Sequence, residues 1–202
     1  EVAYQSSLYY AKERLQGKSI HSKNNADPIL VHPEIRKNLI HIKSLNEGIR
    51  ALMLWVGNQF DIIKLSNDQK EKNNSENIIA LMTPILKSFS TDVGCDSANT
   101  AIQIYGGHGY IKDHGMEQLL RDVRITTIYE GTNGIQALDL IGRKMQINDG
   151  ALYDDFFRLI NNYIDELSTN NDLKTFLNQF KKSFEELLIA TNYLRSIDPF
   201  IV

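Results

Sequence analysis

Hydrophobic residues recur every three or four positions along most of the chain, a spacing that lines one face of an α-helix. The longest stripe runs from Ile35 to Val56 and predicts a helix over residues 32–65. Similar spacing predicts helices over residues 2–17, 78–93, 98–105, 117–125 and 134–145. No segment shows the alternation typical of a β-strand. The pattern predicts an all-α fold in which long antiparallel helices form a four-helix bundle.

Two features interrupt this pattern near the middle of the chain. Residues 66–77 contain no apolar side chain, so packing cannot offset the entropy lost on ordering them. We expect a mobile surface loop there. Pro84 lies inside the helical pattern that follows, and its missing N–H predicts a kink or a helix that starts at this point.

The end of the chain has a pattern of its own. Asn148-Asp149-Gly150 is a turn signal and predicts a domain boundary, with one domain over residues 1–147 and an extension over residues 148–202. Two amphipathic segments follow it, over residues 152–167 and 173–194, joined by a polar turn. They predict a helical hairpin docked on the bundle.

Composition narrows the functional classes. The chain has 202 residues, 22 Lys and Arg against 25 Asp and Glu, and a net charge of −3, so it lacks the basic excess of nucleic-acid-binding proteins. It has no run of about 20 apolar residues, so no membrane span is expected. The only cysteine, Cys95, excludes an intrachain disulfide and fits the cytoplasm or another reducing compartment.

Two further observations concern metals and chain ends. The five histidines show no HxxxH pairing and there is no thiolate cluster, so a metal site is not expected. The first residue is Glu1, and no signal-peptide pattern follows it. We therefore expect a piece of a longer chain.

Three glycines follow the helical pattern that ends at Tyr105, in Gln103-Ile104-Tyr105-Gly106-Gly107-His108-Gly109-Tyr110. Glycine lets the backbone approach a ligand closely, and consecutive N–H groups in such a turn can bind phosphate oxygens. A helix end followed by a tight turn is the ordinary alternative. His108 likewise has two interpretations, a ligand contact or a hydrogen-bonded structural residue.

Two charged residues are further candidates. Glu130 lies in Ile128-Tyr129-Glu130-Gly131-Thr132, which breaks the helical pattern. A carboxylate on such a break, beside apolar neighbours, can act as a general base, although a solvated surface glutamate is the more common case. Arg14 could bind a phosphate through its planar guanidinium or could form an ordinary surface ion pair.

Taken together, these segments resemble the C-terminal helical domain of the acyl-CoA dehydrogenase family. The matching sequences are YAKERLQGK (residues 10–18), AIQIYGGHGY (residues 101–110) and LLRDVRITTIYEGTNGIQ (residues 119–136). Their joint occurrence at this spacing is far more specific than any one of them. The resemblance covers residues 2–145 and implies a four-helix domain, and residues 150–202 are similar to the helical extension of a longer subgroup of the family.

The resemblance implies that FAD lies between subunits of a homodimer or homotetramer. Five residues match positions that approach the FAD of a neighbouring subunit: Arg14, Gln16, Gln103, Gly106 and Gly107. Thr132 and Asn133 match positions that contact the FAD of their own subunit. His32 lies near a position that also approaches the cofactor in relatives.

The resemblance also implies a reaction, the α,β-dehydrogenation of an acyl-CoA thioester. Glu130 matches the catalytic base that takes the α-proton while hydride passes to flavin N5, and Gly131 would line the substrate site. Electrons would then pass to an electron-transfer flavoprotein. An acyl-CoA oxidase is the alternative enzyme, and the chain by itself could be an inactive module for oligomerisation and cofactor covering.

Overall fold

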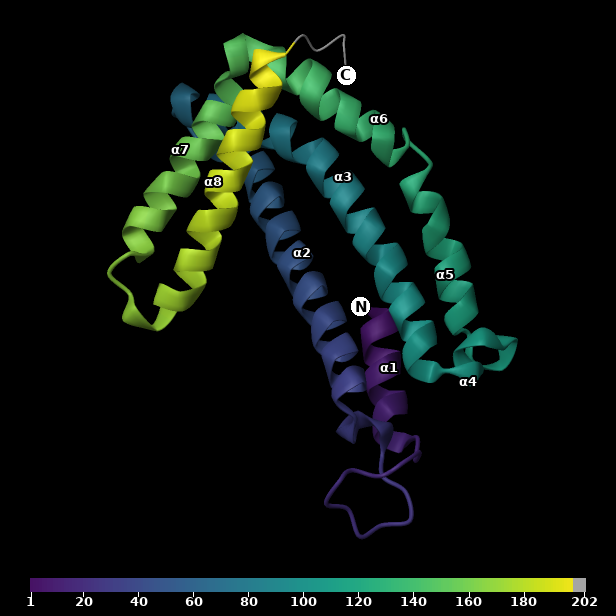
Figure 1. Ribbon diagram of the computed structural model, residues 1–202. Coiled ribbons are helices and arrows are strands. Elements are labelled where there is room, and N and C mark those ends of the chain that lie inside the picture. Colours follow the sequence, from purple (N-terminus) through teal and green to yellow (C-terminus); the bar gives the residue numbers. More distant parts are fainter. Residues whose placement is uncertain (198–202) are drawn as a thin grey trace. The chain divides into compact units, whose positions relative to one another are not determined.

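The computed structural model describes residues 1–197, and its regular elements there are all helical (Figure 1). The only extended pairing among these residues is an isolated bridge between Leu15 and Pro28. The predicted all-α class is therefore confirmed. The longer helices are α1 (Val2–Glu13), α2 (Pro33–Leu65), α3 (Gln69–Tyr105), α5 (Met116–Arg124), α7 (Ala151–Leu167) and α8 (Lys174–Ser196).

Short helical segments connect the longer helices. Two are α-helical, α4 (Gly107–Tyr110) and α6 (Asn133–Leu138), and η4 (Asp139–Arg143) is π-helical. The 3-10 segments are η1 (Ile29–Val31), η2 (Lys112–His114), η3 (Ile125–Thr127), η5 (Lys144–Gly150) and η6 (Asn171–Leu173).

The chain divides into two compact units. The first consists of Glu1–Trp55 and Leu86–Asn133, and the second of Val56–Ile85 and Gly134–Val202. Helices α2 and α3 each contribute residues to both units. The predicted boundary between residues 147 and 148 remains a prediction.

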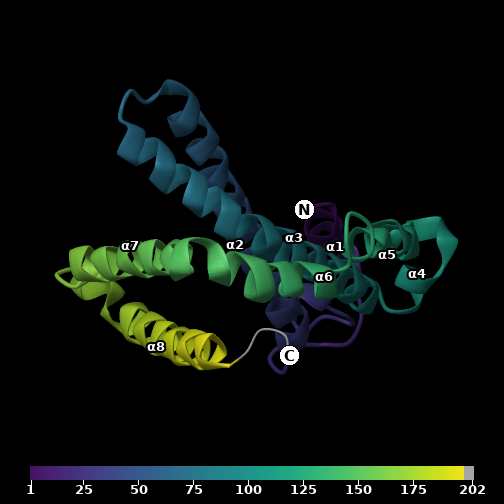
Figure 2. The same cartoon turned by 90° about the horizontal axis from the view of Figure 1, so that it is seen from above.

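The first unit has a core made by helices from both ends of its sequence. Ala11, Ile29, Leu39, Ile42 and Ile104 form one buried cluster. Ala3, Ala101 and Met116 form another. Each large aliphatic side chain buried in this way contributes about 1.5–3 kcal/mol. Figures 1 and 2 show α1 lying along the first part of α2 and the last part of α3.

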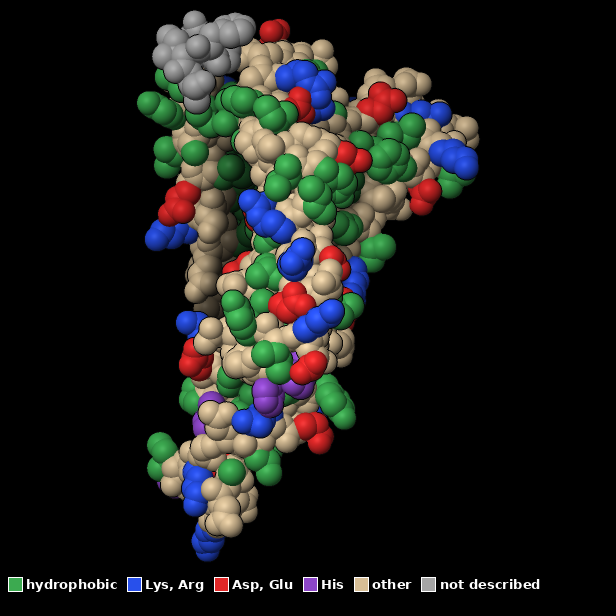
Figure 3. Space-filling model, turned by 90° about the vertical axis from the view of Figure 1, so that its right-hand side faces the viewer, with side chains coloured by type: hydrophobic (Ala, Val, Ile, Leu, Met, Phe, Trp, Pro, Cys, Tyr) green, Lys and Arg blue, Asp and Glu red, His purple; other side chains and the backbone are tan. Residues whose placement is uncertain are grey.

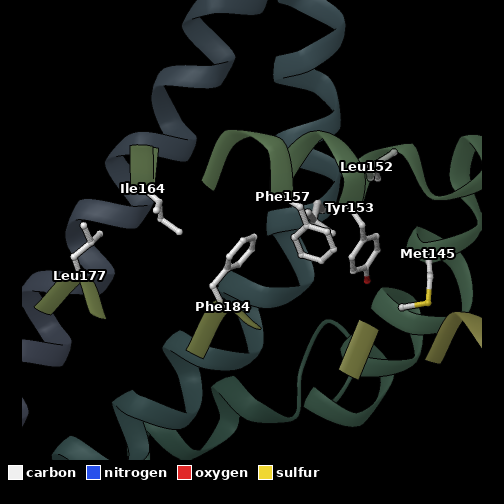
Figure 4. Close-up of a cluster of buried hydrophobic side chains, with 8 residues drawn as sticks. Met145, Leu152, Tyr153, Phe157, Ile164, Leu177 and Phe184 are labelled. Atoms are coloured by element: carbon white, nitrogen blue, oxygen red, sulfur yellow. The ribbon is translucent and has the colours of Figure 1, made fainter. Parts of the chain in front are cut away.

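The second unit contains the predicted hairpin of α7 and α8 (Figures 1 and 2). Its buried cluster, most of which is labelled in Figure 4, consists of Leu81, Met145, Leu152, Tyr153, Phe157, Ile164, Leu177 and Phe184. The rings of Phe157 and Phe184 meet edge to face, with centroids 5.7 Å apart. Arg195 Nη2 donates a hydrogen bond of 2.9 Å to the Gly150 carbonyl, which ties the end of α8 to the start of α7.

The expectation of a mobile loop over residues 66–77 is wrong, because α3 begins at Gln69. Gln, Lys and Glu in this stretch are good helix formers. Asp68 Oδ1 accepts a hydrogen bond from the backbone N–H of Lys70 (2.8 Å). Ser75 is 2% exposed and donates to Gln59 Oε1 (3.0 Å). A count of apolar residues could not anticipate that a polar pair would be buried here.

Other helix ends also differ from the expected ones. Helix α3 passes through Pro84, so no helix starts there. Helix α1 ends at Glu13 rather than near Gly17, because Arg14 is extended and its carbonyl accepts from the N–H of Ile29 (2.8 Å). The helix expected over residues 134–145 is α-helical only to Leu138 and continues as η4 and η5.

The turn predicted at residues 148–150 is confirmed. Asn148, Asp149 and Gly150 all have positive φ angles, of 50°, 56° and 89°. Asn and Asp tolerate this region better than most residues, and glycine adopts it without steric cost.

Helix α3 is also long enough, and over one 18-residue window apolar enough, to cross a membrane by length and composition alone. A core helix in a bundle passes the same test. In the first unit α3 buries Ala98, Ala101 and Ile104, and 17% of that window is buried in all. One helix that meets this test is weak evidence of a membrane span.

Candidate active site and cofactor site

The glycine turn at the end of α3 exposes its backbone. Gly106 has a φ of 59°, a region that favours glycine, and its N–H donates to the Gln103 carbonyl (3.1 Å). A Cβ placed on Gly106 or Gly107 would meet no heavy atom within 4 Å. A ligand can therefore approach this backbone closely.

A cluster of aromatic side chains packs against the turn. The Tyr10 hydroxyl lies 2.9 Å from His108 Nδ1 and 3.3 Å from the Tyr105 carbonyl oxygen, to which it can donate. The Tyr10 and Tyr105 rings stack at 4.0 Å, and those of His108 and His114 stack at 4.7 Å. Figure 3, which views the molecule from the right-hand side of Figure 1, shows histidine side chains close together on the surface. Of the two interpretations of His108, the structure supports the hydrogen-bonded structural residue.

A cavity of about 330 Å³ lies beside the turn. Arg14 and Gln16 line it from the connection that follows α1, and Gln103 and Gly106 line it from the end of α3. The structure thus brings together four of the five residues matched to the FAD of a neighbouring subunit, and Gly107 follows the fourth in sequence. His32 also lines the cavity.

The connection that carries Arg14 and Gln16 is held by a buried carboxylate. Asp27 is 4% exposed, and its carboxylate accepts hydrogen bonds from Ser19 N–H (2.9 Å), Ser22 Oγ (2.7 Å) and Asn24 Nδ2 (2.8 Å). These bonds favour the charged form and lower the pKa of Asp27 to about 2. The Asp27 carbonyl accepts from the N–H of Gln16 (2.9 Å), so the carboxylate network positions the cavity wall.

The break that carries Glu130 lies between η3 and α6. Glu130 has a φ of 53° and Gly131 a φ of 83°. A positive φ is uncommon for a residue other than glycine and often marks a functional site. The Glu130 side chain is exposed, as are those of Ile128 and Tyr129 beside it. The carboxylate is therefore accessible to a substrate, and it has apolar neighbours.

The break contacts α3 well away from the cavity. Asn133 Nδ2 donates to Thr91 Oγ1 (3.1 Å) and to Asp92 Oδ1 (2.8 Å), whereas Gln103 is at the end of the same helix. At 1.5 Å per residue, the 12 residues from position 91 to position 103 span roughly 18 Å. Thr132 and Asn133 are consequently in a different region from Arg14 and Gln16.

Motif reasoning missed several residues that shape these regions. Tyr10 and Tyr105 hold the glycine turn, and Lys87 contacts the Glu130 break through Gly131. Tyr10 and Tyr105 are 95 positions apart, and Lys87 is 44 positions from Gly131. Only Tyr10 and Tyr105 lay inside matched segments, and nothing in the sequence indicated Lys87.

The all-α bundle described above has the architecture of an acyl-CoA dehydrogenase C-terminal domain. Residues 2–146 match the family model described as "Acyl-CoA dehydrogenase, C-terminal domain". The chain belongs to the acyl-CoA dehydrogenase family, and the resemblance drawn from its motifs is confirmed.

Two relatives illustrate the match. The chain is 38% identical over 152 residues to 3-methylmercaptopropionyl-CoA dehydrogenase of Ruegeria pomeroyi. This match covers 75% of the chain and 26% of the relative. It is 56% identical over 138 residues to an acyl-CoA dehydrogenase of Bacillus subtilis. That match covers 68% of the chain and 31% of the relative. The chain thus spans between a quarter and a third of the length of these curated relatives.

A solved structure supports the fold. Caenorhabditis elegans ACDH-11, crystallised in complex with C11-CoA, superposes with a TM-score of 0.77 at 19% identity. The superposition covers 92% of this chain and 29% of that one, so it includes most of the α7–α8 hairpin as well as the family domain.

Proposed function

We propose that this chain is the C-terminal part of an FAD-dependent acyl-CoA dehydrogenase and that Glu130 is its catalytic base. The observation that carries the proposal is the exposed Glu130 carboxylate on a positive-φ break within Ile128-Tyr129-Glu130-Gly131-Thr132. The family match over residues 2–146 supports the same assignment.

The cavity residues fit part of an FAD molecule. The Arg14 guanidinium suits a phosphate group, the amides of Gln16 and Gln103 can both donate and accept, and the Gly106-Gly107 backbone is open to close approach. When bound, FAD supplies the acceptor for hydride from the β-carbon of the substrate. Thr132 and Asn133 would hold the FAD of their own subunit. The roughly 18 Å along α3 between the two regions supports a homodimer or homotetramer with shared sites.

The residues of the break would do the proton chemistry. The α-proton of an acyl thioester is only weakly acidic, so a positioned base must remove it while the carbonyl oxygen receives hydrogen bonds. The Glu130 carboxylate would take the proton and its backbone N–H would donate to the thioester oxygen. Gly131 leaves room for the substrate because it has no side chain.

Electrons would leave through an electron-transfer flavoprotein, as the family resemblance implies. An acyl-CoA oxidase would instead pass them to oxygen, and the rate of flavin reoxidation by air distinguishes these two enzymes. The chain by itself lacks most of the length of its relatives, so alone it would act only as a module that covers the cofactor and joins subunits.

The test is Glu130→Gln in the complete protein. The amide keeps the size of the side chain but cannot accept the α-proton, so turnover should fall by about 10²-fold or more while the protein remains yellow with bound FAD. Anaerobic bleaching of the flavin by a panel of acyl-CoAs measures the loss and identifies the preferred chain length. Glu76→Gln, at an exposed position in α3, is the control. Normal turnover of the Glu130 variant would refute the assignment.

A further inference from the structure

A lysine of α3 holds the break that carries Glu130. Lys87 Nζ donates hydrogen bonds to the carbonyl oxygen of Gly131 (2.7 Å) and to Asn133 Oδ1 (2.8 Å). The side chain is half-buried. Lys87 therefore joins the middle of α3 to the residue directly after the proposed base.

Neighbouring residues of α3 reinforce this contact. The Asn133 amide nitrogen donates to Asp92 Oδ1 (2.8 Å) and Thr91 Oγ1 (3.1 Å), while its oxygen accepts from Lys87. Thr91 Oγ1 also donates to the Lys87 carbonyl (2.8 Å). Residues 87–92 of α3 thus hold both the Gly131 carbonyl and Asn133, the first residue of α6.

The break needs such a contact because its backbone geometry is unfavourable without one. Neither Glu130 nor Gly131 lies in a helix, and both have positive φ. A glutamate released from this geometry would move toward negative φ, which is the allowed region for most residues. That rotation would turn both the Glu130 carboxylate and its N–H away from their present directions.

We propose that Lys87 is a positioning residue for proton abstraction, which holds the Glu130-Gly131 turn through the Gly131 carbonyl and Asn133. The inference rests on the proposed function, in which Glu130 is the base. Lys87 acts through the backbone and does not itself take the proton. A charged amine is well suited to this contact, because hydrogen bonds with an ionised partner are roughly twice as strong as neutral ones.

The test replaces Lys87 by methionine in the complete FAD-loaded protein. Lys87→Met keeps the length of the side chain and removes its hydrogen bonds. We expect kcat to fall by about ten- to a hundredfold, since small displacements of a catalytic group have effects of this size. The isotope effect with α-deuterated acyl-CoA should rise, because proton removal becomes more rate-limiting. Because Asn133 is also proposed to hold FAD, kcat is measured per bound FAD, and KM should change little.

Two further variants make the result decisive. Lys70→Met, at an exposed position on the same helix, should leave kcat and the isotope effect unchanged. Lys87→Arg keeps a cationic donor and should recover part of kcat. If Lys87→Met does not fold, the arginine variant still decides. A folded Lys87→Arg protein that keeps part or all of the native kcat supports the donor role, and one with no residual activity overturns it.

Failure of the inference differs from failure of the proposed function. A folded Lys87→Met protein with native kcat and isotope effect, alongside an inactive Glu130→Gln protein, would overturn the role of Lys87 alone. An active Glu130→Gln protein would overturn the proposed base itself.

Discussion

Asp27 shows how one carboxylate can organise a polar connection. The residues between α1 and η1 include few apolar side chains, yet the connection has a defined form because Asp27 accepts three hydrogen bonds within it. Its backbone also pairs with Gly17, whose carbonyl accepts from the Asp27 N–H (2.9 Å). The cost of burying a charge is offset here by hydrogen bonds to the charged form.

The lowered pKa predicts a pH dependence of stability. The folded-state pKa of Asp27, about 2, lies below the ordinary value of 3.8 for this side chain, so its stabilising contribution is present above about pH 4 and is lost as the pH falls toward 2. Asp27→Asn should lower the free energy of unfolding at pH 6 and reduce its decline between pH 4 and pH 2. Urea unfolding at several pH values measures both effects. The exposed Asp61→Asn is the control, and parallel pH curves for the Asp27 variant and the native protein would contradict the prediction.

At the scale of elements, periodicity predicted the helices whose apolar stripes face a core. Helix α2 was expected over residues 32–65 and occupies Pro33–Leu65, and the α7–α8 hairpin was also expected. The first turns of α3 were missed because they are stabilised by helix propensity and by the buried Ser75–Gln59 hydrogen bond, neither of which adds an apolar residue to the pattern. The premature end of α1 depends on pairing with residues 27–29, a contact that local spacing does not reveal.

Helix α4 packs against the end of α3 with almost no space at Gly109. A Cβ there would lie 2.6 Å from the Ile102 carbonyl oxygen and 2.8 Å from Tyr105 Cβ. The same addition at Gly107 would meet nothing within 4 Å. The two glycines of this short helix therefore have different roles, one in packing and one in leaving the backbone accessible.

Alanine substitutions separate these roles. Gly109→Ala should lower stability by about 1–3 kcal/mol, because the added methyl group forces backbone atoms apart. Gly107→Ala is the matched control and should be neutral or stabilising by up to about 1 kcal/mol, since alanine favours a helix. Thermal and urea unfolding of the flavin-free protein measure both. Equal stabilities of the two variants would show that α4 does not pack as described.

At the scale of the whole molecule, the motifs predicted the residues that line the cavity better than the residues that hold those in place. Arg14, Gln16, Gln103 and Gly106 were matched from separate segments, and the fold brings them to one cavity. The residues that hold them, such as Tyr10 and Asp27, follow from tertiary contacts that no single motif contains. Lys87 belongs to the same category, because its partners are more than 40 positions away.

Arg14 tests the proposed sharing of FAD between subunits. Arg14→Ala in the complete protein removes a guanidinium from the cavity wall, and a hydrogen bond to a charged group contributes about 1.5–3 kcal/mol. The dissociation constant for FAD should therefore rise by about ten- to a hundredfold, and bound FAD should be lost on gel filtration. Turnover per bound flavin should remain near the native value, because Arg14 is far from the proposed base. Arg36→Ala, at an exposed position in α2 outside the cavity, is the control, and unchanged FAD content in the Arg14 variant would count against the shared site.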